Sequence, residues 1–255
     1  MRTSNPALNE KAFRNSRAQE SSSAMSIQGT VNKTVIMLGI LFCTATLTWH
    51  QFQKTGDPST VMPWMMIGAI GGLILSLVII FSNKTAPYMA PIYAALQGFF
   101  LGGLSAIVEV NYPGIAFQAT VLTFGTLFGL LAAYKSGMVR ATENFKLGVV
   151  AATGGIGLVY LASFVMGFFG INMPFIHEGG IIGIGFSAFV VVIAALNLVL
   201  DFDFIEEGSK MGAPKHMEWY AAFGLMVTLV WLYIETVSYT HLRAHETRHD
   251  LVCRL

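Results

Sequence analysis

The sequence predicts an all-α membrane protein with seven transmembrane helices, and three observations carry this prediction. Of its 255 residues, 54% are hydrophobic and 11% are charged, whereas roughly 25% are charged in a typical soluble domain. Several apolar runs are long enough to cross a bilayer, and the Lys and Arg residues fall almost entirely between alternate runs. A water-soluble chain of this length could not bury so much apolar surface, so we expect the lipid bilayer to surround it.

Seven segments are candidate transmembrane helices. Five of them contain no charged residue and exceed the roughly 18 to 20 residues needed to cross a bilayer, namely residues 61–83, 85–108, 110–134, 147–176 and 179–200. A first segment at 34–52 and a last one at 219–234 give weaker signals, so a count of six or eight would come from misjudging one of these. Backbone groups in lipid must bond within their own segment, which predicts a helix for each.

The distribution of Lys and Arg predicts the orientation. With a cytoplasmic N-terminus, the opposite loops before the last helix hold only Lys54. Such a bias is what the positive-inside rule expects of a multi-pass protein. We therefore expect the following basic residues to be cytoplasmic: Arg2, Lys11, Arg14, Arg17, Lys33, Lys84, Lys135, Arg140, Lys146, Lys210 and Lys215.

Two terminal regions are predicted to lie outside the membrane domain, which we expect at residues 31–237. Residues 1–30 are polar and rich in Ser, Asn and Arg, which indicates a disordered cytosolic tail rather than a cleaved signal peptide. Residues 238–255, SYTHLRAHETRHDLVCRL, resemble foreign sequence and are predicted to be a non-native tail. The alternative is a helix face that could hold a metal ion, formed by His241, His245 and His249.

Composition and motifs argue against several functions. The net charge of +1 implies no nucleic-acid partner, and Cys43 and Cys253 predict no disulfide framework. The stretch GIGFSA at 183–188 imitates a dinucleotide fingerprint but lacks the strand–turn–helix context. The same stretch contains Ser187, but an intramembrane serine enzyme would need a base, and the last span contains no histidine. A seven-helix retinal receptor would need a lysine in its last helix to bind retinal, and this span contains none. We therefore expect neither enzymatic activity nor a resident cofactor.

Glycines recur four residues apart in the apolar segments. Small residues at this spacing let two helix backbones approach closely. Ordinary helix packing is therefore the expected role of the pairs Gly68 and Gly72, Gly98 and Gly102, Gly125 and Gly129, and Gly179 and Gly183.

The stretch LNLVLDFDFIEEG, residues 196–208, is the main candidate functional site. It follows 22 residues without a charge and contains four acids, Asp201, Asp203, Glu206 and Glu207. In a helix, Asn197 and Asp201 form a polar stripe pointing back into the membrane, whereas the other three acids share a face toward the inner aqueous mouth. A solvated interfacial cap would explain those three. Acids beside Asn at membrane depth are costly and usually mark ion or proton pathways.

Three segments resemble one known family. LVLDFDFIEEG, the following helix MEWYAAFGLMVTLVWLYIE, and LQGFFLGGLSAIVE in the third span resemble the Bax-inhibitor, or transmembrane Bax-inhibitor-motif (TMBIM), family. The resemblance covers about residues 30 to 237 and is strongest to the bacterial members. It implies six helices around a central seventh and a pH-sensitive calcium leak, in a bacterial inner (plasma) membrane.

In that family, two aspartates on the last two helices share a proton and latch the pore. Asp201 matches the first of them, and Thr228 stands where the second belongs. Glu235 lies two turns further along, at about 1.5 Å per residue, so Glu109 is its expected neighbour rather than Asp201. The nearest alternative acids for Asp201 are Asp203, Glu206, Glu207 and Glu218, all expected at the inner mouth. The family's acid and arginine of span two are replaced here by apolar residues.

The calcium leak that the resemblance implies is compatible with gating by protonation of these residues. Carboxylates held close together cannot all ionise cheaply, so they titrate as a unit. Calcium prefers several carboxylate and carbonyl oxygens, so we expect Asp201 and Asp203 to bind Ca²⁺ as the transported ion. Two alternatives remain open. One is a non-conducting regulator that binds a membrane protease, another membrane protein, or a stress or cell-death factor. The other is a proton-coupled transporter.

Overall fold

The computed structural model describes residues 24–170 and 181–252, with side chains omitted for residue 181 and residues 245–252. Seven helices in these ranges are long and apolar enough to cross a membrane, which confirms the predicted fold class. They are α2 (Ile27–Thr55), α3 (Met62–Phe81), α4 (Ala86–Asn111), α5 (Ile115–Lys135), α6 (Glu143–Phe168), α8 (Ile181–Lys210) and α9 (Met217–Val252). Short 3-10 turns at Pro58–Thr60 and Asn83–Thr85 precede α3 and α4.

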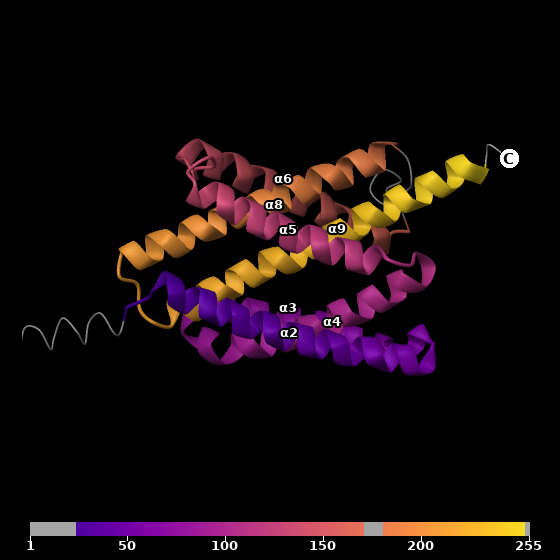
Figure 1. The fold of residues 1–255 in the computed structure, drawn as a ribbon, viewed down its shortest axis with the longest axis horizontal. Helices are drawn as coiled ribbons and strands as arrows, with labels where there is room; N and C mark the ends of the chain where they lie inside the picture. Colours follow the sequence, from indigo (N-terminus) through magenta and orange to yellow (C-terminus); the bar gives the residue numbers. More distant parts are fainter. Residues whose placement is uncertain (1–23, 171–180, 253–255) are drawn as a thin grey trace, which may run out of the picture.

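The last helix lies at the centre of the bundle, as predicted. Figure 1 shows α9 running diagonally between α2, α3 and α4 on one side and α5, α6 and α8 on the other. In its most apolar stretch 67% of the residues are buried, against 44% or fewer in each other helix. Helices α2, α4, α5 and α8 pack directly on α9, whereas α3 packs on α4 and α6 packs on α8.

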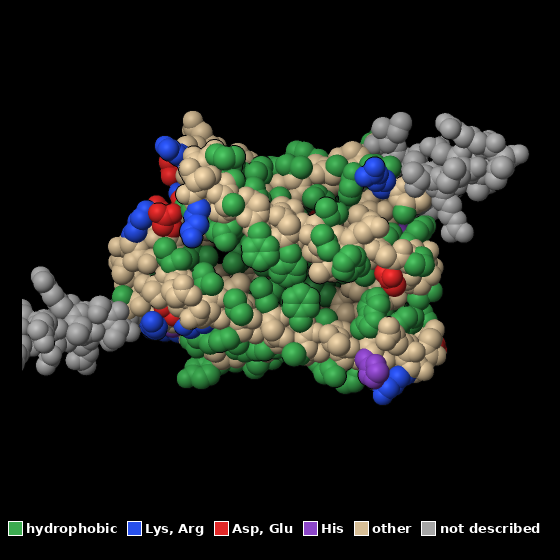
Figure 2. All heavy atoms as spheres, in the orientation of Figure 1, with side chains coloured by type: hydrophobic (Ala, Val, Ile, Leu, Met, Phe, Trp, Pro, Cys, Tyr) green, Lys and Arg blue, Asp and Glu red, His purple; other side chains and the backbone are tan. Residues whose placement is uncertain are grey.

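The outer surface of the bundle is apolar around its middle. Figure 2 shows hydrophobic side chains across the centre of the face and charged side chains gathered at its two ends. Helix α3, for example, exposes Ile67, Ile70, Leu73 and Ile74 by more than half of each side chain. Surfaces of this kind are stable against lipid rather than water, so the protein contacts the bilayer. We call the end that carries Lys33, Lys146, Lys210 and Lys215 the basic end, and the other the Lys54 end.

Several helix boundaries differ from the predicted ones for local reasons. Helix α2 begins at Ile27, inside the predicted tail, because the Ser26 side chain accepts a hydrogen bond from the backbone N–H of Gly29. Helix α5 begins at Ile115 because Gly114, at a φ of 92°, turns the chain first. Helix α9 continues to Val252 without a break at residue 237, so the predicted non-native tail begins within a helix.

Two of the predicted glycine pairs mediate close packing. A Cβ atom at Gly68 would lie 2.5 Å from the Leu96 carbonyl oxygen, and one at Gly102 would lie 2.5 Å from the Ala45 carbonyl oxygen. Their partners Gly72 and Gly98 are similarly crowded, so α3 and α2 both pack closely against α4. The prediction is wrong for Gly125 and Gly129, whose added Cβ atoms would meet no atom within 4 Å. Gly179 lies outside the described residues.

Replacing Gly102 by valine is expected to destabilise the protein by about 1 to 3 kcal/mol, because the new side chain overpacks the contact between α2 and α4. Gly129→Val is the matched control, since its side chain would enter open space. Thermal unfolding in detergent should show a lower transition temperature for Gly102→Val alone. Equal shifts in the two variants would contradict the close approach of α2 and α4.

Candidate functional site

The acids of α8 lie in its last three turns, at the basic end of the bundle. The charged side chains on the left of Figure 2 mark this end, where α8 finishes and α9 begins in Figure 1. The loop between the two helices is short, because Gly212 adopts a left-handed φ of 66° and the chain turns back at Pro214. The carboxylates of α8 are therefore held beside the start of the central helix.

Asp201 faces the central helix. Its Oδ2 atom is inaccessible to solvent and has no hydrogen-bond partner. The hydroxyl of Thr228 on α9, a residue only 8% exposed, lies beside the Asp201 carboxyl and interacts with it. The two residues expected to correspond to the family's aspartate pair are therefore neighbours, with a neutral hydroxyl in place of the second carboxyl.

Asn197 lies one turn from Asp201 on α8, but it contacts a different helix. Its Nδ2 atom donates to Thr153 Oγ1 on α6 at 2.8 Å and to the Ile193 carbonyl oxygen at 2.9 Å. The predicted polar stripe of Asn197 and Asp201 therefore divides between α6 and α9. It joins the three helices by polar contacts within an otherwise apolar interface.

The remaining acids of α8 are paired with groups on α5, α6 and α8 itself. Lys146 Nζ on α6 lies 2.7 Å from Asp203 Oδ2 and 3.9 Å from Glu207 Oε2. The Tyr134 hydroxyl on α5 donates to Glu206 Oε2 at 2.7 Å, and Lys210 Nζ lies 2.5 Å from Glu206 Oε1. These three acids lie at the basic end as predicted, but they form a network that ties α5, α6 and α8 together.

The carboxyls of Asp201 and Asp203, which are predicted to bind calcium, contact different helices. Asp201 contacts α9, whereas Asp203 contacts Lys146 and lies 3.4 Å from the Tyr134 hydroxyl. Residues two apart on a helix point in different directions, and this separates the two carboxyls. Among the residues described, no three His, Cys, Asp or Glu side chains are grouped so that they could hold a metal ion. The side chains of His245 and His249 lie outside the described part, and the ring of His241 packs against Tyr112.

Glu218 occupies a different setting from the predicted solvated mouth. Its side chain is fully buried, and Lys33 forms an ion pair with Oε2. Both the backbone N–H and the hydroxyl of Ser26 donate to Oε1 at 2.9 Å, and Lys215 Nζ lies 3.1 Å from the same oxygen. We call Ser26, Lys33, Lys215 and Glu218 the Glu218 cluster. It fixes the start of α2 to the start of α9.

Glu235 lies two turns beyond Thr228 on α9 and is 6% exposed. Its Oε1 atom accepts hydrogen bonds from the Tyr160 hydroxyl on α6 at 2.9 Å and from Trp231 Nε1 at 3.1 Å. The predicted neighbour Glu109 instead caps α5, where it accepts from the backbone N–H of Gly114 at 2.6 Å.

These contacts form a line of polar groups where α6, α8 and α9 meet. From the Lys54 end toward the basic end, the line passes through Glu235 with Tyr160, Asn197 with Thr153, Asp201 with Thr228, and Asp203 with Lys146. We call these eight residues the polar track. The sequence analysis identified the residues of the polar track that lie on α8. It did not predict that Thr153, Tyr160 and Lys146 of α6 would contact residues of α8 and α9. Of these three, Lys146 alone had a sequence signal, because its charge, immediately before the predicted fifth span, placed it at the same end of the bundle as Asp203.

The comparison with known families agrees with the resemblance seen in the α8 and α9 segments. The family model described as Bax inhibitor 1 like matches residues 5–239. No curated protein and no solved structure matches the chain. The match ends at residue 239, two residues beyond the predicted end of the membrane domain. Of the candidate spans in the described residues, it covers the first six in full and the seventh, Met217–Ala244, up to residue 239. The chain therefore belongs to the Bax inhibitor 1 like family.

Proposed function

We propose that the protein is a pH-sensitive calcium leak of a bacterial inner (plasma) membrane, with its N-terminus in the cytoplasm. Calcium would cross along the polar track, and protonation of Asp201 would gate it. The observation that carries this proposal is the buried Oδ2 atom of Asp201, which lacks a hydrogen-bond partner although the carboxyl lies beside Thr228 of the central helix. A buried carboxylate oxygen without a hydrogen-bond partner is costly when the group is charged, so the protonation state of Asp201 is coupled to the packing of α8 against α9.

Thr228 allows this site to exist in two charge states. A hydroxyl can donate to a carboxylate and can accept from a protonated carboxylic acid, so the contact with Asp201 survives the gain of a proton. A second carboxyl at this position would instead share the proton with Asp201. We therefore infer that one acid, rather than a pair, senses pH in this chain.

The basic end supplies the oxygen ligands that would attract the cation. Asp203, Glu206 and Glu207 bring three carboxylates to one surface, and hard cations such as calcium favour such oxygens. Lys146 and Lys210 now neutralise part of this charge. An arriving cation would compete with these lysines, and loss of the Lys146 contact would loosen α6 from α8. Displacement of Lys146 by the cation would therefore link the entry of the ion at the basic end to its passage along the polar track.

Calcium flux into proteoliposomes, measured from about pH 5 to pH 8, tests the proposal. We expect flux above that of protein-free vesicles, with a rate that changes with pH. An ionophore added at the end establishes that the vesicles are intact and that the dye responds. If intact vesicles carrying folded protein show no flux at any pH, the leak is excluded and a regulatory role takes its place. Flux that requires a proton gradient would instead identify a coupled transporter.

A further inference from the structure

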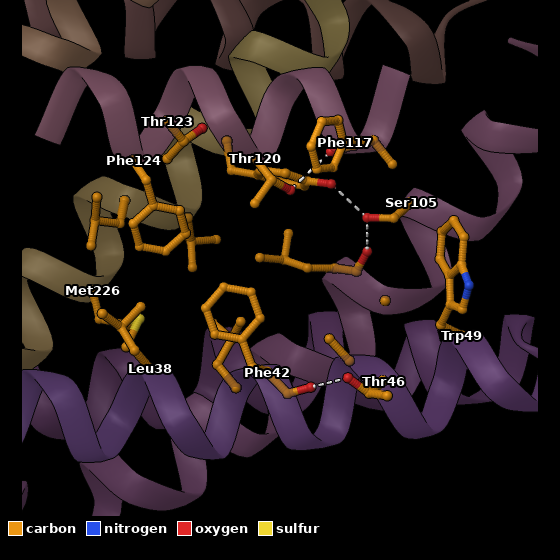
Figure 3. A pocket seen from close by; sticks show the side chains of 18 of the residues that line it. Leu38, Phe42, Thr46, Trp49, Ser105, Phe117, Thr120, Thr123, Phe124 and Met226 are labelled. Atoms are coloured by element: carbon orange, nitrogen blue, oxygen red, sulfur yellow. Dashed lines mark hydrogen bonds between the residues drawn. The ribbon is translucent and has the colours of Figure 1, made fainter. Parts of the chain in front are cut away.

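A second feature, separate from the polar track, is a cavity between α2, α4, α5 and α9. Its volume is about 360 Å³, which lies within the roughly 300 to 1,000 Å³ of small-ligand pockets. Apolar and aromatic side chains form most of its wall, including Leu41, Phe42, Phe117, Phe124 and Met226. Figure 3 shows Phe42 from α2 and Phe124 from α5 pointing toward one another across the space. The wall suits a hydrocarbon chain.

The cavity opens sideways between α2 and α5. The backbones of these two helices hardly approach each other, and the stacked rings of Phe42 and Phe124, with centroids 5.7 Å apart, bridge the gap. Phe42 is 44% exposed and Phe117 is 74% exposed. Figure 2 shows the hollow in the middle of the apolar face. Since this face lies in the membrane, the molecules at the opening are lipids.

Polar groups line the cavity toward the Lys54 end. Ser105 Oγ lies 2.6 Å from the Tyr233 hydroxyl, and Thr120 lies beside that hydroxyl as well. Glu109 is one turn beyond Ser105 on α4 and also lines the cavity. Its carboxylate accepts backbone N–H groups of Gly114 and Ala116, but no Lys, Arg or His side chain in the described ranges forms an ion pair with it. The cavity therefore joins an apolar wall to an acid that forms no ion pair with a basic side chain in the described part of the chain.

We propose that this cavity binds one acyl chain of an aminolipid from the surrounding bilayer, with the lipid's ammonium group hydrogen-bonded to Glu109. Charge complementarity selects the headgroup, because a carboxylate attracts an ammonium and repels an anionic headgroup. The lateral opening selects a bilayer lipid over a water-soluble amine, since the apolar wall is reached from the hydrocarbon region. Trp49 also lines the cavity and lies near Ser105 in Figure 3, and it has the amphipathic ring that is common at the membrane interface.

Native mass spectrometry of the purified protein with phosphatidylethanolamine, phosphatidylcholine and phosphatidylglycerol of identical acyl chains tests this inference. We expect one molecule of phosphatidylethanolamine to be retained, about tenfold more tightly than phosphatidylglycerol. Glu109→Gln should abolish the preference for phosphatidylethanolamine over phosphatidylcholine while leaving retention through the acyl chain. A short-chain alkylamine should not compete, because it gains only the headgroup contact.

Ala45→Phe is designed to fill the cavity and should remove the retained lipid. Leu47→Phe is the matched control on the same helix, because Leu47 is 64% exposed and does not line the cavity. If Ala45→Phe fails to fold, Thr46→Phe at the exposed edge of the cavity provides the same test. Equal retention of the three lipids by the wild type would overturn the headgroup assignment. Unchanged retention in the folded filling variant would overturn the cavity as the site.

Discussion

Replacing Glu218 by alanine is expected to destabilise the folded protein by about 3 kcal/mol or more, because removing one partner of a buried ion pair leaves the other uncompensated. The Glu218 carboxylate is fully buried and bonded by Lys33, Lys215 and Ser26. Lys33, whose side chain is only 17% exposed, would lose its ion-pair partner. Thermal unfolding of the purified variant in detergent should show a large fall in the transition temperature.

Glu143→Ala is the matched control for this change. Glu143 also lies in the first turn of a helix and also forms an ion pair with a lysine, at 3.4 Å from Lys146 Nζ, but its side chain is 91% exposed. Exposed pairs of this kind contribute about 1 kcal/mol or less. If both variants unfolded at the wild-type temperature, the Glu218 cluster would have no role in holding α2 to α9.

Replacing Asp201 by asparagine is expected to abolish the pH response of calcium flux. Asparagine is close to aspartate in size and neutral at every pH, so the variant holds the site in the charge state of the protonated acid. Its flux at all pH values should therefore equal the wild-type flux at the acidic end of the range. We expect the wild type to change by about tenfold over the same range, since one pKa unit corresponds to 1.36 kcal/mol.

The Glu235→Gln variant distinguishes the contribution of Asp201 to the pH response from that of Glu235, the other buried acid on the polar track. Glutamine can still accept hydrogen bonds from Tyr160 and Trp231, which hold Glu235 in place. This variant should retain most of the pH response, because Glu235 lies two turns from Thr228 on α9. A flat response in Glu235→Gln together with a wild-type response in Asp201→Asn would place the pH sensor near the Lys54 end instead.

The sequence predicted those parts of the site that depend on spacing along one helix. The apolar runs gave the seven helices, and the α8 and α9 motifs gave the neighbouring positions of Asp201 and Thr228. Helical spacing also separated Asp201 from Asp203, although both were expected to bind calcium. Sequence periodicity thus located the acids along α8 and separated Asp201 from the other three, but it did not show which helix each side chain contacts.

Contacts between distant segments could not be predicted in the same way. Tyr134 and Glu206 are 72 residues apart in the chain, and Lys33 and Glu218 are 185 apart. Which side chains meet across such separations depends on the order and rotation of the packed helices, and a single apolar pattern does not specify these. For this reason Glu218 was expected at a solvated mouth but is buried among Ser26 and two lysines. Glu109 was paired with Glu235 in the prediction, but it caps α5.

The central position of α9 has a consequence for biosynthesis. This helix is translated after the six others, so they enter the membrane before the element around which they pack exists. Until then, the small and polar side chains that will face α9 are covered by lipid, the insertion machinery or one another. The first residues of α2 must also wait for Lys215 and Glu218 before their contacts can form. A ribosome stalled before Met217 should therefore leave an inserted but loosely assembled chain, sensitive to membrane proteases that the finished bundle resists.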